Sequence, residues 1–217
     1  MTDNINYKHI VNYLNDTLPD GEGILGELEK YAFNHCTPII QKEVRCFIDT
    51  LLECHKPKRI LEIGTAIGYS SILMAKNTPE DSEIITIERY EKVADIAIGN
   101  IFDAGFEKKI KVVKGEAVDI INWLDGGFDM VFMDGAKGQY IEFLPRILEL
   151  MNQGGVLITD DVLYNDPNVE ENATTRHRKY TIVQRLRTYL EVICNHPQLE
   201  TTVLEIGDGM AISYKKG

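Results

Sequence analysis

Glu62-Ile-Gly-Thr-Ala-Ile-Gly68 is the stretch that decides the fold of this chain. It follows an apolar strand pattern, Arg59-Ile-Leu-Glu-Ile63, and precedes a helix-like run from Tyr69 to Lys76. Glycine is favoured where a backbone turns tightly or passes close to a ligand. The order of strand, glycine turn and helix therefore predicts a βα unit of an open α/β sheet, with a ligand site at the turn.

Two acidic residues beside this turn indicate the kind of ligand. The glycine spacing is G-x-x-x-G, not the G-x-G-x-x-G of dinucleotide sites, and the carboxylate of Glu62 would repel a pyrophosphate. It suits a ligand with an ammonium and a sulfonium, such as S-adenosylmethionine. Glu88 ends the next strand pattern, where an acid accepts hydrogen bonds from ribose hydroxyls in doubly wound folds. The alternative is a plain structural turn.

Size and charge set the outer limits on function. A chain of 217 residues fits one α/β domain with a substantial core. A net charge of −11 gives no global attraction to nucleic acid or to an anionic membrane, although it leaves room for a local basic patch. We expect no membrane segment and no signal peptide. The scattered cysteines are expected to be reduced thiols of a cytoplasmic protein: Cys36, Cys46, Cys54 and Cys194.

Strand and helix patterns alternate along the chain from Arg59 onward, which predicts a parallel sheet covered by helices on both faces. The expected strands are 59–63, 83–88, 110–114, 128–133 and 155–160, and the helices between them are 68–77, 91–104, 116–124 and 138–150. Helices at 5–17, 24–35 and 39–55 precede this region, and a helix at 175–195 follows it.

Two last strand patterns, 201–206 and 210–215, flank Gly207-Asp-Gly209, which predicts a hairpin turn. We therefore expect one domain over residues 1–217, with an N-terminal helical cap (1–56) and a Rossmann-like core (57–217). The core would hold a seven-stranded, mostly parallel sheet that ends in an antiparallel hairpin. This architecture resembles the class I methyltransferase fold.

Aspartates follow two strands of the predicted sheet. Asp134 ends the pattern 128–133, and Asp160 and Asp161 end the pattern 155–160. Neighbouring parallel strands end at one edge of a sheet, so these carboxylates are expected to converge. They would repel one another unless a cation neutralised them, and oxygen ligands favour Mg²⁺, or else Mn²⁺ or Ca²⁺. Adjacent residues on a strand point to opposite faces, so Asp160 and Asp161 can bind one cation only if the chain turns at this point. The alternative is that one aspartate caps a helix or loop and the other is solvated.

Lys137 lies three residues after Asp134, on a turn that leads into a helix. Beside a metal ion and a sulfonium, its pKa would be lowered toward the range of a general base. A metal would acidify an acceptor hydroxyl in the same step, and the resulting oxyanion could attack the methyl group in line. The alternative is a solvated surface charge.

Four blocks of the chain together resemble a known family. They are Leu61-Glu-Ile-Gly-Thr-Ala-Ile-Gly-Tyr-Ser70, Thr86-Ile-Glu-Arg89, Met133-Asp-Gly-Ala-Lys-Gly-Gln-Tyr140 and Ile158-Thr-Asp-Asp-Val-Leu163. They look like the metal-dependent O-methyltransferases of the catechol and caffeoyl-CoA type. The segments Ala136–Tyr140, Asn195-His-Pro197 and Gly207–Ser213 are most similar to the bacterial tRNA 5-hydroxyuridine methyltransferases, which make 5-methoxyuridine at the wobble position.

The resemblance implies a role for each matching residue. The methionine part of the donor would be lined by Glu62, Gly64, Gly68, Tyr69 and Ser70, its ribose held by Glu88, and its adenine flanked by Arg89, Glu116 and Ala117. Asp134, Asp160 and Asp161 match the metal ligands, Lys137 matches the base, and Asp134 also borders the donor. The chain departs from the family at Asp161, where asparagine is usual, and at Glu116, where aspartate is commoner.

The identity of the acceptor depends on a basic segment. Arg176, Arg178, Lys179, Arg185 and Arg187 lie in residues 173–187, which contain no acid. The first three are expected to contact RNA phosphates; the alternative is a solvated helix face. Three functions remain open: methylation of tRNA 5-hydroxyuridine, methylation of a small catechol-like or caffeoyl-CoA-like hydroxyl, or donor binding without catalysis. Members of the family are commonly homodimers, so a homodimer is expected.

Overall fold

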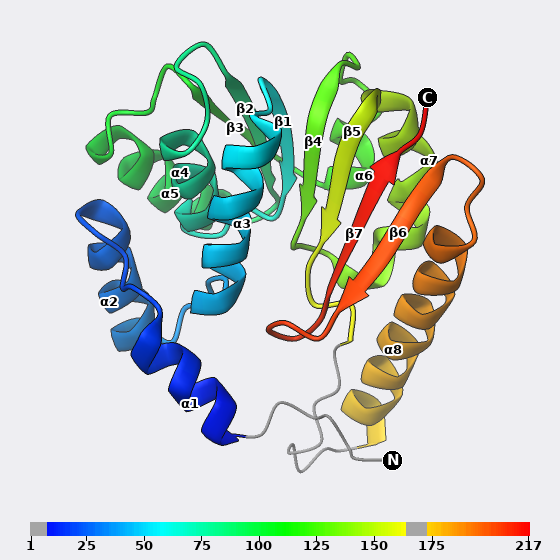
Figure 1. Cartoon of the computed structure of the whole chain (residues 1–217), viewed down its shortest axis with the longest axis horizontal. Helices are drawn as coiled ribbons and strands as arrows, with labels where there is room; N and C mark the ends of the chain where they lie inside the picture. Colours follow the sequence, from blue (N-terminus) through cyan, green and yellow to red (C-terminus); the bar gives the residue numbers. More distant parts are fainter. Residues whose placement is uncertain (1–7, 164–172) are drawn as a thin grey trace.

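The computed structural model describes the backbone of residues 8–163 and 173–217 and the side chains of 9–163 and 180–217. Within this part, seven strands form one sheet in the order β3-β2-β1-β4-β5-β7-β6 (Figure 1). The strands are β1 (Arg59–Ile63), β2 (Glu83–Glu88), β3 (Ile110–Lys114), β4 (Phe128–Met133), β5 (Met151–Thr159), β6 (Leu199–Leu204) and β7 (Met210–Lys215). The first five are parallel, and β7 runs antiparallel to both β5 and β6. The predicted α/β fold with its C-terminal hairpin is confirmed.

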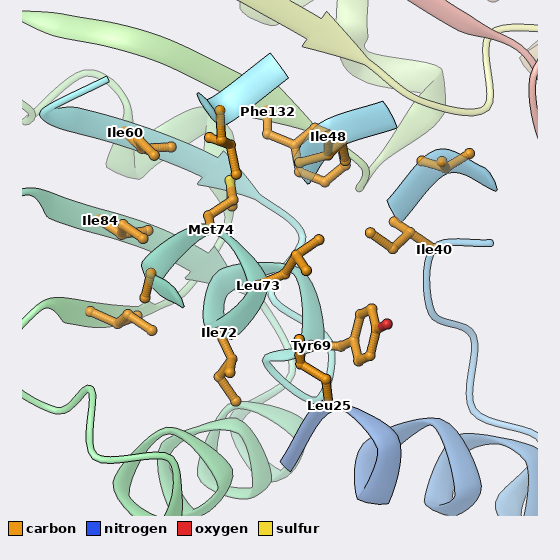
Figure 2. Close-up of a cluster of buried hydrophobic side chains, with 14 of the residues drawn as sticks. Leu25, Ile40, Ile48, Ile60, Tyr69, Ile72, Leu73, Met74, Ile84 and Phe132 are labelled. Atoms are coloured by element: carbon orange, nitrogen blue, oxygen red, sulfur yellow. The ribbon is translucent and has the colours of Figure 1, made fainter. Parts of the chain in front are cut away.

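Helices cover both faces of the sheet. One face packs against α2 (Ile24–His35), α3 (Lys42–His55), α4 (Tyr69–Lys76) and α5 (Glu91–Asp103), and the other against α6 (Ala117–Ile120), α7 (Tyr140–Leu150) and α8 (Ala173–Cys194). Successive strand side chains point to opposite faces, so Ile60 joins the first layer and Leu61 the second. Figure 2 shows the first layer, in which Leu25 of α2 lies near Tyr69 of α4.

The N-terminal helices extend this layer beyond the sheet. Helix α1 (Lys8–Thr17) precedes α2, and Figure 1 shows the pair at the side of the molecule opposite to α8. No helix of the described residues is both long and apolar enough to span a membrane.

Several predicted boundaries were wrong, for local reasons. Helix α3 begins at Lys42, not at residue 39, because the backbone is still extended at Gln41. Helix α6 is a single turn, not the predicted 116–124. Strand β5 begins at Met151, since a register shift near Phe128 lets its first residues pair with β4. Strand β6 runs from Leu199 to Leu204, not over 201–206, so the hairpin connection is longer than the predicted three-residue turn.

Candidate active site

A cavity of about 560 Å³ lies at the carboxyl ends of the parallel strands, where open α/β sheets bind ligands. Turns that follow β1, β2, β3, β4 and β5 form most of its wall. The remainder comes from the connection between α2 and α3 and from the β6–β7 hairpin. The predicted residues that line it are Gly64, Glu88, Arg89, Glu116, Ala117, Asp134, Lys137, Asp160 and Asp161.

The glycine turn brings the ends of β1 and β4 together. Gly64 has a φ of 105°, and a Cβ atom there would lie 2.9 Å from the backbone of Asp134 and Gly135. A Cβ atom at Gly135 would likewise lie 2.9 Å from the Cα atom of Gly64. Side chains at either position would push the turns apart, so both glycines are required for the close approach.

Glycine is favoured at position 68 for a different structural reason. Its φ is 86°, it precedes α4, and a Cβ atom there would lie 3.4 Å from the Cβ atom of Ala97 in α5. The glycine thus allows two helices to pack closely, and it does not line the cavity. Its predicted contact with the donor stays a prediction.

Glu62 lies beneath the cavity rather than in its wall. The side chain is fully buried, and its Oε2 atom accepts hydrogen bonds from Ser71 and, at 2.5 Å, from Thr86. Burial raises the pKa of Glu62, and the charge of Glu88 acts in the same direction. The Oε1 atom is buried and accepts no hydrogen bond from any described residue. A buried acceptor without a donor is costly, so this atom fits the ammonium group of a bound methyl donor.

Tyr69 and Ser70 also lie outside the wall of the cavity. The Tyr69 hydroxyl donates a 2.6 Å hydrogen bond to Glu29 of α2, which ties the cap to the first helix of the core. Burial and the neighbouring Glu29 carboxylate raise the pKa of Tyr69. Ser70 is buried in α4. In this structure both residues pack behind the glycine turn, and their predicted contacts with the donor stay predictions.

Glu88 and Arg89 lie at the end of β2, beside the glycine turn. The two Glu88 oxygens accept hydrogen bonds from the backbone N–H groups of Ala66, at 3.0 Å, and Tyr90, at 2.9 Å. Each oxygen keeps a further lone pair that a ribose hydroxyl can use. The Arg89 guanidinium lies 4.5 Å from the centre of the Tyr90 ring and donates to the Tyr90 hydroxyl.

The end of β3 completes the part of the cavity assigned to the adenine. Glu116 is exposed and immediately precedes α6, and Ala117 is buried at the start of that helix. Apolar side chains of Ile87 and Val93 line the same part of the cavity. The mixture of an apolar wall and a few acids matches a nucleoside that is held mainly by packing.

The three aspartates line one end of the cavity because the chain turns sharply after β5. Asp161 has a φ of 59°, which breaks the strand alternation, so both Asp160 and Asp161 face the cavity. The backbone N–H of Asp161 donates to Asp160 Oδ1 at 2.9 Å. Asp134 follows β4, the neighbouring strand. The turn that the sequence requires for this convergence is present.

The aspartates disfavour one another's charge. Burial raises the pKa of Asp134 well above its usual range, and the charges of Asp160 and Asp161 raise it further. Burial and the Asp161 charge raise the pKa of Asp160 to about 7. A cation bound among these groups would relieve the repulsion by favouring their charged forms.

Lys137 begins a short 3-10 helix, η1 (Lys137–Gln139), and its ammonium group forms an ion pair with Asp161. The preceding residue, Ala136, has a left-handed φ of 60°, which turns the chain back toward the cavity. The structure thus places Lys137 beside the aspartates, as the sequence predicts.

Comparisons with known proteins identify the family of this chain. The family model described as O-methyltransferase matches residues 16–216. This chain belongs to the O-methyltransferase family. It is 32% identical over 179 residues to a catechol O-methyltransferase of Niastella koreensis, covering 78% of this chain and 79% of that protein. It is 29% identical over 176 residues to caffeoyl-CoA O-methyltransferase 2 of Populus trichocarpa, covering 76% and 70%.

Solved structures agree with the family. An O-methyltransferase of Bacillus cereus in complex with S-adenosylhomocysteine has a TM-score of 0.81 and 26% identity over 96% of this chain and 97% of that one. TomG of Streptomyces achromogenes, in complex with S-adenosylmethionine, has a TM-score of 0.81 and 25% identity over the whole of both chains. The protein is therefore an S-adenosylmethionine-dependent O-methyltransferase, which sets aside the prediction of a non-catalytic binding protein.

The candidate metal ligands of this O-methyltransferase have the chemistry that a divalent cation requires. The aspartates supply only oxygen ligands, which Mg²⁺, Mn²⁺ and Ca²⁺ prefer. No three histidine, cysteine or acidic side chains of the described residues are already grouped as a metal site. Lys137 neutralises Asp161 here, so a cation would compete with that ammonium group. The metal remains a prediction.

Two residues of the O-methyltransferase site were missed in the sequence. Asp208, in the β6–β7 hairpin, also lines the cavity, and burial and the Asp161 charge raise its pKa. In the sequence, Asp208 belongs to a predicted turn and to a family-like segment, but it was assigned no role. Tyr140 is fully buried behind the aspartates, and its hydroxyl lies 3.4 Å from the Met133 carbonyl oxygen and 3.3 Å from that of Asp160. Tyr140 ends one of the family-like blocks, but the sequence assigned it no role.

The basic residues of α8 are only partly described. The side chains of Arg176, Arg178 and Lys179, the predicted RNA contacts, lie outside the described residues. Arg185 donates to Glu142 at 2.9 Å and to the Gly138 carbonyl oxygen at 2.8 Å, so its charge is used within the O-methyltransferase.

Proposed function

We propose that this O-methyltransferase depends on a divalent cation and methylates 5-hydroxyuridine at the wobble position of tRNA, giving 5-methoxyuridine. One observation carries the methyl-transfer chemistry: Lys137 and three converging aspartates line the same cavity as the glycine turn and Glu88. Donor and acceptor can therefore meet in one cavity, where their orientation lowers the barrier to transfer.

Each group has a distinct task in the proposed reaction. Asp134, Asp160 and Asp161 would hold the cation, which supplies one effect when bound: it lowers the pKa of the acceptor hydroxyl. The neutral amine of Lys137 accepts the proton of that hydroxyl at Nζ. The acceptor oxygen forms a bond to the methyl carbon as the bond between that carbon and sulfur breaks. The products are a methyl ether and S-adenosylhomocysteine.

The tRNA acceptor is supported by charge and by position. Arg176, Arg178 and Lys179 are close together in a chain of net charge −11, so a positive patch there is a local feature that suits phosphate. They lie in the first turns of α8, a helix that packs on the turn carrying Lys137 through Arg185. A wobble uridine is unpaired in its loop, so no duplex must open for it to reach the cavity.

A small-molecule acceptor is the second candidate. The relatives described above are named as catechol and caffeoyl-CoA O-methyltransferases. A catechol hydroxyl and the C5 hydroxyl of a pyrimidine are similar in acidity and shape, so one cavity can suit both. Arg185 is engaged with Glu142, which leaves fewer cations of α8 available to RNA.

The experiment that separates the two acceptors compares tRNA containing 5-hydroxyuridine with free catechol, each with donor and Mg²⁺. Products are measured by mass spectrometry of nucleosides and of the catechol ether. A triple variant of Arg176→Gln, Arg178→Gln and Lys179→Gln should lose tRNA methylation and keep any catechol methylation. The control variant Lys76→Gln, Lys108→Gln and Lys111→Gln removes three exposed charges elsewhere. Equal tRNA methylation by both triple variants would refute the tRNA proposal.

A further inference from the structure

The turn that carries Lys137 has little support of its own. None of the three residues of η1 is buried, and the preceding Ala136 holds a left-handed backbone conformation. A hydrogen bond from the Gln139 N–H to the Ala136 carbonyl oxygen, at 2.7 Å, closes the turn internally. The position of the Lys137 amine therefore depends on what holds the turn from outside.

Helix α8 supplies that outside contact. Arg185 Nη1 donates to the carbonyl oxygen of Gly138, the residue after Lys137, at 2.8 Å. The same nitrogen donates to Glu142 Oε1 of α7 at 2.9 Å. A Cβ atom at Gly138 would lie 3.7 Å from Ile182 and 4.0 Å from the Arg185 side chain, so α8 lies directly against η1.

We infer that Arg185 is a positioning residue for methyl transfer: its hydrogen bond to Gly138 fixes the turn that presents Lys137, and Glu142 holds the guanidinium in place. The inference rests on the proposed function only in taking Lys137 as the base. An arginine stays charged at any working pH and is less hydrated than lysine, so it can hold a carbonyl oxygen at a half-exposed site. Arg185 does not line the cavity.

Arg185 thus has a role within the protein that differs from RNA binding. Its sequence neighbours Arg176, Arg178 and Lys179 were grouped with it as a basic segment, but its Nη1 atom has two acceptors within the protein. Arg187 is also exposed and lies two residues further along α8. Arg187→Ala therefore removes the same charge from the same helix and is the matched control for Arg185→Ala.

The structural arm of the test is hydrogen exchange measured by mass spectrometry on the full chain. In Arg185→Ala, amides of residues 135–140 should exchange roughly 2- to 12-fold faster, the range expected for the loss of one hydrogen bond. Exchange in Arg187→Ala should match the parent. Lysine at 185 can donate to both acceptors from one nitrogen, so Arg185→Lys should restore most of the protection. Unchanged exchange in Arg185→Ala would overturn the inference without bearing on the proposed function.

The kinetic arm uses whichever acceptor, tRNA or catechol, the parent methylates. Arg185→Ala should lower kcat roughly 5- to 50-fold, because small displacements of a catalytic group are costly, and should leave the KM for the donor unchanged. A KM effect alone, or a kcat equal to that of Arg187→Ala, would overturn the positioning role. A parent that methylates neither acceptor would defeat the proposed function, and the exchange measurement would still decide whether Arg185 holds the turn.

Discussion

The backbone of Gly64 lies so close to that of Asp134 that a Cβ atom at Gly64 would be 2.9 Å from the Asp134 carbonyl carbon and oxygen. The Asp134 N–H in turn donates to the carbonyl oxygen of Ile63, at 2.9 Å. The donor turn and the first aspartate of the acid cluster are thus joined through backbone atoms. Neither can shift without displacing the other.

Alanine at position 64 should therefore be strongly destabilising. The left-handed φ costs about 1–3 kcal/mol in unfolding free energy, and the backbone overlap adds to it. Denaturant unfolding measures the change, and donor binding should weaken in the same variant. Gly99 of α5 is the control, because an added Cβ there would meet no described atom within 4 Å apart from its chain neighbours and the backbone of its own helix. Gly99→Ala should stabilise the protein by about 0.5–1 kcal/mol. Equal stability of the two variants would contradict the close approach.

Replacing Lys137 by methionine tests the proposed base. The variant keeps the length of the side chain but cannot accept the proton, so kcat should fall roughly 10²- to 10⁴-fold. Calorimetric titration with S-adenosylmethionine should give an unchanged Kd, because the predicted donor contacts are made by other residues. A variant that turns over at the parental rate would exclude Lys137 as the base.

The succession of strands and helices along the chain and the end of the sheet that carries the cavity could be predicted from the sequence, because periodicity and glycine positions are local signals. The position of Asp160 and Asp161 at the cavity end of β5 could be expected from the strand pattern, whereas the turn at Asp161 that lets both line the cavity was only one of two alternatives. The surroundings of Glu62 could not be predicted. Its burial follows from the register of β1 against β2, which sets it opposite Thr86, and register is a long-range property.

The roles of Asp208 and Arg185 could not be predicted from the sequence either, because they too depend on long-range packing. Asp208 reaches the cavity only because the hairpin folds back over the end of β5, where the Val162 N–H donates to the Gly209 carbonyl oxygen. Arg185 contacts Gly138 across 47 positions of sequence. Composition marked Arg185 as one member of a basic segment, whereas its role depends on the packing of α8 against η1.

Asparagine at position 161 tests the cation site. The change keeps one oxygen ligand but removes a charge, so the Kd for Mg²⁺ should rise roughly tenfold, while alanine should abolish binding. Both Kd values are measured by calorimetry with the donor present, so the readout does not depend on turnover. Glu107→Gln, which neutralises an exposed acid, is the control. Tighter binding by Asp161→Asn would mean that Asp161 is no ligand and that its ion pair with Lys137 is its main role.

Asp129 should make the unfolding free energy of the protein vary with pH in the acid range. Although burial opposes it, hydrogen bonds from the Asn152 amide and the backbone N–H groups of Lys58 and Arg59, at 2.8, 2.9 and 3.1 Å, lower its pKa. A lowered folded-state pKa gives stability that is complete above the unfolded pKa of about 3.9 and is lost as the pH falls through the folded value. Asp129→Asn should therefore cost about 1–3 kcal/mol at pH 7.

This difference between the parent and Asp129→Asn should shrink as the pH falls below about 4, because the parental carboxylate then becomes protonated. Urea unfolding at pH 7 and at about pH 3 measures it, with Glu53→Gln, an exposed acid of α3, as the control. The three donors come from the start of β1 and from β5, so Asp129 fastens three neighbouring strands at the end opposite the cavity. Turnover at pH 7 and a temperature well below unfolding should consequently stay at the parental value. If Asp129→Asn lost the same unfolding free energy at both pH values, the loss would come from poorer packing of the amide and not from the removed charge.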